Sequence, residues 1–150
     1  MKRITIIILM TVLCGICHAQ DALFRKYADV NGISTVYISK SMFRMMPNIK
    51  AGNKDISRIS SKIDKMQILN CERPSLIPSV KRVAKSTYKK GKYEDVMQIN
   101  ENGEHTVIYQ KLHPNGKHEF VLFCEEKDEL SIINIFGSVT LSEIRNIADN

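Results

Sequence analysis

The stretch "YEDVMQINENGEHTVIYQKLHPNGKHEFVLFCEEKDELSIINIFG", residues 93–137, decides the fold. It contains four segments in which apolar and polar residues alternate: YEDVMQI, EHTVIYQKL, HEFVLFCE and ELSIINIFG. Alternation with a period of two is typical of β-strands that bury one face. Asn102-Gly103 and Asn115-Gly116 lie in two of the links, and hairpin turns favour such pairs. We therefore predict a four-strand antiparallel meander.

The second of these links permits two hairpin registers. With a two-residue Asn115-Gly116 loop, His113 would lie directly opposite His118 on one face. His105 would lie further along that face, so that the three side chains could share a metal ion. With a three-residue loop, His113 pairs with Lys117 and His118 moves to the other face, because a shift of one residue inverts every side chain.

We favour the three-residue register. It sets Lys111 opposite Glu119 as a favourable cross-strand charge pair. It also avoids a ladder hydrogen bond that Pro114 cannot donate. It gathers an apolar set on one side of the hairpin: Ile108, Leu112, Phe120, Leu122 and Cys124. The histidines are then solvated strand residues, and we expect no metal site.

Upstream of the meander, the spacing of apolar residues alternates between helical and strand periods. The predicted strands are STVYIS, residues 34–39, and KMQILNC, residues 65–71. The predicted helices cover residues 21–30, 40–46, 56–63 and 78–90, and a last helix begins near Thr140. We therefore expect an α+β fold: a mainly antiparallel sheet with a C-terminal four-strand meander and with helices packed on one face.

The N-terminus has the layout of a secretory signal peptide. Lys2 and Arg3 precede an uncharged, mostly apolar stretch that runs to Ile16, and small residues at positions 17 and 19 fit a signal peptidase site. The apolar stretch is too short to span a bilayer. We expect cleavage after Ala19, which leaves a single domain, residues 20–150, in the periplasm or outside the cell.

The C-x-x-C pair of Cys14 and Cys17 lies inside this leader, so it is not a redox or metal site of the folded domain. A lipoprotein anchor needs Gly, Ala or Ser before the acylated cysteine. Leu13 precedes Cys14 and Ile16 precedes Cys17, which disfavours a lipid anchor.

The chain carries a net charge of +6. Without the two basic residues of the leader, 20 basic and 16 acidic residues leave a net charge of +4. Such a mildly basic surface is not that of a nucleic-acid-binding protein. No further stretch is long and apolar enough for a transmembrane span. We expect neither a nucleic-acid partner nor a span in the mature domain.

Four segments of the mature chain together resemble a known family: FRKYADVNGISTVYISKSMFRMMP, SKIDKMQILNCE, YEDVMQINENGEHTVIYQKL and ELSIINIFGSVTLSEIRNIA. The most telling pieces are residues 36–40, Ile68-Leu69 ahead of Cys71, and Phe136-Gly137 leading into Leu141. On these the chain is similar to domain-of-unknown-function family 4252, exported envelope proteins of Bacteroidetes type. The resemblance implies an exported envelope protein of undefined activity and offers no functional residues to carry over.

Cys71 and Cys124 are the two cysteines outside the leader. In an oxidising exported compartment an even pair is a candidate disulfide. Two separately buried thiols are an equally good interpretation, because cysteine is among the most buried residue types.

The predicted helix 78–90 carries a cationic stripe without an acidic residue: Lys81, Arg82, Lys85, Lys89 and Lys90. This stripe could meet lipid headgroups, lipopolysaccharide phosphates or an acidic protein face. A solvated helix face is the simpler interpretation, since cations near a helix C-terminus also complement its dipole.

Met42, Met45 and Met46 surround Phe43 in a short helical piece. Flexible thioethers suit an adaptable apolar pocket and could hold Cu(I). Their helical spacing favours packing in or near the core.

No serine elbow, zinc-protease motif, phosphate-binding glycine loop or dinucleotide fingerprint occurs in the sequence. The acidic cluster of residues 125–129 lies at a hairpin tip, where nothing would raise a carboxyl pKa. We therefore expect a non-enzymatic interaction domain without a cofactor, which binds a protein or an anionic envelope component. The alternative is a small-ligand-binding domain with an apolar pocket between sheet and helices, and a degradative or redox enzyme is a third, less favoured class.

Overall fold

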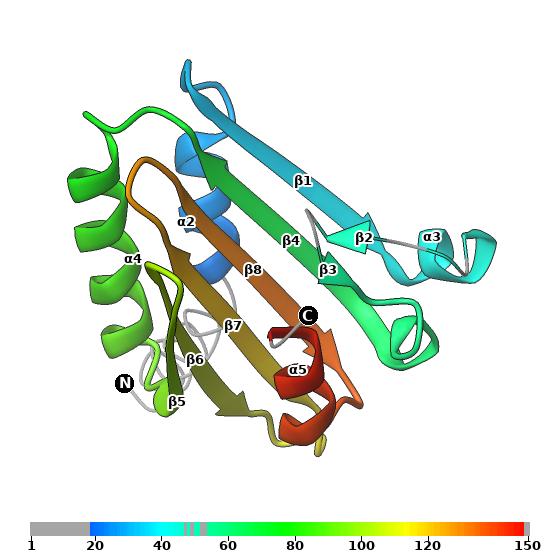
Figure 1. Cartoon of the computed structure of the whole chain (residues 1–150). Coiled ribbons are helices and arrows are strands. Elements are labelled where there is room, and N and C mark those ends of the chain that lie inside the picture. The colour runs from blue at the N-terminus through cyan, green and yellow to red at the C-terminus, as the bar shows by residue number, and fades with distance from the viewer. Residues whose placement is uncertain (1–18, 47, 49, 52–53, 149–150) are drawn as a thin grey trace, which may run out of the picture.

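The computed structural model describes residues 19–46, 48, 50–51 and 54–148 (Figure 1). The predicted leader, apart from Ala19, lies outside the described residues, and so do Cys14 and Cys17.

A six-stranded antiparallel sheet forms the centre of the molecule, in the order β1-β4-β8-β7-β6-β5 (Figure 1). Its strands are β1 (Ile33–Ser39), β4 (Ile63–Cys71), β5 (Glu94–Glu101), β6 (Glu104–Leu112), β7 (His118–Glu125) and β8 (Leu130–Gly137). Two short strands, β2 (Lys50–Ala51) and β3 (Lys54–Asp55), form a separate pair. The α+β class and the C-terminal meander, β5 to β8, are confirmed.

The three-residue register of the β6–β7 hairpin is also confirmed. Lys111 lies opposite Glu119, and the His113 N–H donates to the Lys117 carbonyl at 2.9 Å. Gly116 has a φ of +77°, a left-handed conformation that glycine adopts at little cost. Leu112 differs from expectation, because it lies at the end of β6 and is exposed.

Helices cover both faces of the sheet (Figure 1). The face that we call the α4 face packs against α2 (Ala19–Tyr27) and α4 (Ile77–Lys90). The opposite α5 face packs against α3 (Lys40–Met45), the 3-10 turn η1 (Ser60–Lys62) and α5 (Leu141–Ala148). The expectation of helices on one face therefore describes α2 and α4, while the shorter helices close the other side.

The helix expected over residues 56–63 is wrong. Only η1 is helical in this segment, and Ile63 already begins β4. Ile56, Ile59 and Ile63 are nevertheless buried in the core of the α5 face. Tight turns with close to three residues per turn bring Ile56 and Ile59 to the same side. The spacing of these apolar residues in the sequence is therefore the same as that of an α-helix.

Helix α4 connects β4 to the far edge of the sheet. A proline lies in its first turn, as expected, and the C-cap is Gly91, whose N–H donates to the Thr87 carbonyl at 2.9 Å. Val80, Ala84 and Tyr88 are fully buried against the sheet. This burial fixes the rotation of the helix and turns its cationic side outward.

Candidate functional site

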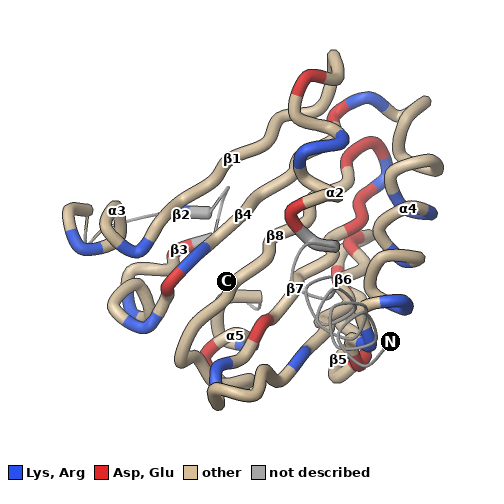
Figure 2. The backbone as a smooth tube through the Cα atoms, turned by 180° about the vertical axis from the view of Figure 1, so that it is seen from behind, with Lys and Arg blue, Asp and Glu red and all other residues tan. Residues whose placement is uncertain are grey.

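The outer side of α4 is the first candidate site. Arg82, Lys85, Lys89 and Lys90 are exposed, at positions that lie along one helix face. Figure 2 shows this helix with basic segments and without an acidic one. The helix thus presents a row of positive charge to the solvent.

Two of the five predicted cations are partly engaged with the protein itself. Lys81 donates through Nζ to both carboxylate oxygens of Glu125, each at 2.6 Å. Lys85 places its ammonium 5.8 Å from the centre of the Phe123 ring. We define the basic surface as the remaining three: Arg82, Lys89 and Lys90.

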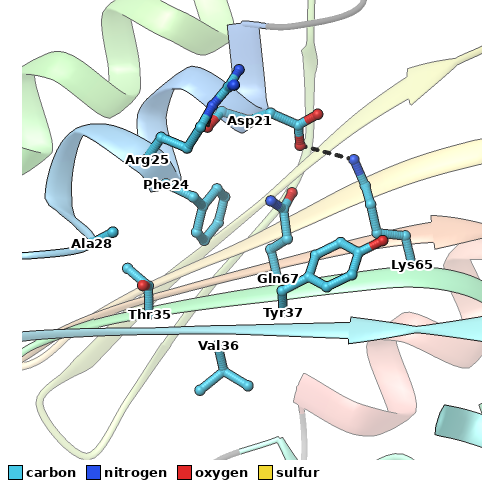
Figure 3. A pocket seen from close by; sticks show the side chains of 9 residues that line it. All are labelled: Asp21, Phe24, Arg25, Ala28, Thr35, Val36, Tyr37, Lys65 and Gln67. Carbon is cyan, nitrogen blue, oxygen red and sulfur yellow. Dashed lines mark hydrogen bonds and ion pairs between the residues drawn. The ribbon is translucent and has the colours of Figure 1, made fainter.

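The second candidate is a groove of about 540 Å³ between α2 and the strands β1 and β4 (Figure 3). Its lining comprises Asp21, Phe24, Arg25, Ala28, Thr35, Val36, Tyr37, Lys65 and Gln67. An ion pair crosses the groove, from Lys65 Nζ to Asp21 Oδ1 at 3.0 Å. The Val36 side chain points away from it, so this residue contributes to the lining through its backbone.

Gln67 is the most enclosed polar group of this groove. It is 7% exposed, and its Oε1 atom has no hydrogen-bond partner among the described residues. In Figure 3 its side chain rises from β4 towards α2, between Phe24 and Lys65. A buried amide oxygen without a partner costs about 1–3 kcal/mol, unless a water or a ligand donates to it.

A buried polar cluster lies further along the α4 face. Glu119 is 6% exposed; its carboxylate accepts from Asn134 Nδ2 at 2.9 Å and contacts His113 Nε2 at 2.7 Å. The expected charge pair with Lys111 is not formed, because the Lys111 ammonium lies over the Tyr93 ring at 5.2 Å. Glu119 therefore ties β7 to β8 and to the hairpin loop.

Sequence reasoning missed this cluster, although a signal was present. Glu119 belongs to the same alternating set as Val121 and Phe123, which are buried. A carboxylate on a buried strand face requires internal partners. Tyr88 is buried beside it, and burial raises the pKa of that phenol, so the Tyr88 hydroxyl stays neutral.

The structure does not form the candidate disulfide. Cys71 and Cys124 are both buried, and neither is part of a disulfide. They lie on β4 and β7, which flank β8, and they pack on opposite faces of the sheet. Strands two places apart are separated by roughly 9–10 Å, beyond the Cα distance that a disulfide spans.

The predicted methionine pocket divides into a core residue and surface residues. Phe43 is buried and anchors α3, whereas Met42, Met45 and Met46 are exposed. A second groove of about 390 Å³ lies between residues 55–59 and α5, and none of these four residues lines it.

Within the described ranges, no helix is long and apolar enough to cross a membrane. The same residues contain no group of three or more His, Cys, Asp or Glu side chains placed to hold a metal ion. His105 and His118, on opposite sides of the β6–β7 hairpin, contact Asn100 and Gln110 respectively.

Comparison with known proteins gives one match. The family model described as a domain of unknown function, DUF4252, matches residues 27–147. No curated protein and no solved structure matches the chain.

Proposed function

This chain belongs to the DUF4252 family of domains of unknown function, and from that premise we propose that it is an exported, non-enzymatic interaction domain. Its proposed partner is an anionic component of the cell envelope, either a phosphate-bearing lipid surface or an acidic protein face. Export rests on the leader predicted over residues 1–19.

The observation that carries this proposal is the orientation of α4. The basic surface of Arg82, Lys89 and Lys90 points outward because Val80 and Ala84 bury the other side of the helix. No acidic residue on α4 offsets these charges. A fixed row of cations attracts an anionic surface over about a Debye length, roughly 10 Å at 0.1 M salt.

We expect the triple variant R82E/K89E/K90E to lose binding to vesicles that contain phosphatidylglycerol. Each cation near an anionic membrane contributes about 1 kcal/mol, so the loss should be roughly 100-fold or more. Lys81 is left unchanged, because its reversal would oppose Glu125. Co-sedimentation at low and high salt measures the effect, and binding should also fall at high salt.

A matched control is R44E/K50E/R58E, which changes the net charge equally at exposed residues in α3, in β2 and before η1. The control should bind like the native chain. An acidic protein partner instead of lipid would be captured from envelope extract by the native bait and the control, but not by the α4 variant. If both triple variants bound vesicles equally and captured the same proteins, the basic surface would be a solvated helix face without a binding role.

The alternative function, small-ligand binding, is favoured by the groove beneath α2. Gln67 offers an unpartnered acceptor there, and Phe24 offers an apolar wall. The groove lies on the α4 face of the sheet, whereas the apolar pocket expected near Met42 would lie on the α5 face with α3. The rim of the groove is charged rather than apolar.

A further inference from the structure

Strand β1 forms one outer edge of the sheet. Among the residues that the structure describes, it pairs with β4 on one side only, and the strand order ends with it. Its outer side thus leaves backbone N–H and C=O groups available to another strand. Val36 and Tyr37, in the middle of β1, are 47% and 63% exposed.

The sequence of β1 lacks the features that usually block strand addition. Its seven residues, ISTVYIS, include no charge, no proline and no glycine. Figure 2 shows β1 without a basic or acidic segment. Most proteins protect such an edge with charges, prolines, bulges or a covering segment.

The opposite edge, β5, is protected. Its sequence EDVMQINE contains Glu94, Asp95 and Glu101, and its pairing with β6 is interrupted between Asp95 and Met97. An antiparallel pair of two β5 strands would place Glu94 of one copy opposite Glu101 of the other, a repulsive arrangement. The two edges of this sheet therefore differ in their readiness to accept a strand.

We propose that two copies of this chain associate edge to edge through β1, as an antiparallel pair centred on Val36. In this register Val36 of one copy lies opposite Val36 of the other. Tyr37 lies opposite Thr35, a favourable pairing of an aromatic with a β-branched side chain. Lys40, just beyond the strand, falls opposite Gly32, so no like charges meet.

The groove beneath α2 lies along the same edge. Directly opposed residues share a face of the sheet, so Tyr37 of the second copy lies on the α4 face beside Thr35. Thr35, Phe24 and Ala28 line the groove. The ring of the second copy's Tyr37 thus enters the groove of the first copy, and the two-fold symmetry repeats the contact.

The two-fold axis of an antiparallel strand pair is perpendicular to the sheet. Both copies of α4 therefore lie on the same side of the joined sheet. The association itself rests on β1 and does not depend on the proposed role of the basic surface.

Charge substitutions at Val36 test this arrangement. The side chain is half exposed at an outer strand, so V36K and V36E should both fold, as far-UV circular dichroism would show. We expect the native mature chain, residues 20–150, to be a dimer in sedimentation equilibrium. Each single variant should be monomeric at the same concentration, because two like charges then meet at the symmetry axis.

An equimolar mixture of V36K and V36E should restore the dimer, since opposite charges then face each other. The control Q98K places a charge in the middle of β5 and should leave the native dimer intact. The proposal is overturned by a native chain that stays monomeric, by a V36K variant that stays dimeric, by a mixture that stays monomeric, or by a Q98K variant that dissociates.

Discussion

At the scale of single residues, Gly137 marks a close approach of two backbone segments. It lies in β8 between Ile63 of β4 and His118 of β7. A Cβ atom at this position would be 2.2 Å from the Lys62 carbonyl oxygen, which already accepts a hydrogen bond from Ser138 N–H. Glycine is required here by backbone contact.

We expect G137A to lower the free energy of unfolding by at least about 3 kcal/mol, because the backbone of residues 62–63 would have to move. The matched control is G103A, at a turn glycine with open space around it and a φ of +86°. Only the cost of a left-handed alanine applies there, about 1 kcal/mol. Urea unfolding of both variants measures the difference, and equal losses would contradict the close contact.

The residue scale also shows what the sequence could and could not predict at the site. The outward orientation of Arg82, Lys89 and Lys90 follows from helical periodicity, which is local. The hydrogen-bond partners of Glu119 cannot be predicted from such a local pattern. Lys111 is its neighbour in the hairpin register, but the buried carboxylate bonds instead to Asn134 and His113.

At the scale of secondary-structure elements, the insertion of β8 between β4 and β7 determines the fate of the cysteines. The sequence left two interpretations open, a disulfide between Cys71 and Cys124 or two separately buried thiols. Cys71 packs on the α4 face and Cys124 on the α5 face.

We therefore expect both cysteines of the mature protein to be in the reduced, thiol form. Alkylation in denaturant without a reductant, followed by intact mass measurement, should add two alkyl groups. The thermal midpoint should be the same with and without dithiothreitol, because no covalent link is lost. A mass without added groups would show a bond and would contradict the separation of the two strands.

Local elements were predictable from the sequence and non-local ones were not. The meander strands β5 to β8 follow each other through short turns, so alternation and turn residues define them. The pairing of β4 with β8 joins segments far apart in the chain, and no local pattern encodes it. The groove beneath α2 was missed for the same reason, since three separate segments line it.

At the scale of the whole molecule, Asp64 links three distant segments. Its carboxylate pairs with Lys40 at the start of α3 at 2.7 Å, and with Lys117 in the β6–β7 turn. Hydrogen bonds from Lys117 and then Lys40 lower the pKa of Asp64 below its ordinary value. In acid the unfolded chain therefore binds this proton more readily than the folded protein does.

This difference predicts how stability depends on pH. The contribution of Asp64 is fully present above the unfolded pKa of about 3.9 and is lost as the pH falls through the lower, folded-state value. D64N should lower stability by about 1 kcal/mol at pH 7, and the gap to the native chain should narrow below about pH 4. Urea unfolding between neutral and acid pH measures this gap.

The matched control is D29N, at an exposed aspartate in the turn after α2. It should unfold like the native chain throughout the same pH range. A D64N gap that stays constant in acid would show that the ion pairs do not act through the charge of Asp64.

The position of β8 also sets the order in which the domain can be completed. A ribosome releases β1 and β4 first and the strands β5 to β7 later, yet within the sheet these two groups are joined only through β8. Until the chain beyond residue 130 has been made, the nascent protein cannot form the continuous six-stranded sheet. If the leader directs export, the sheet stays incomplete for nearly all of the synthesis of the chain. An incompletely folded chain can still pass through a translocon.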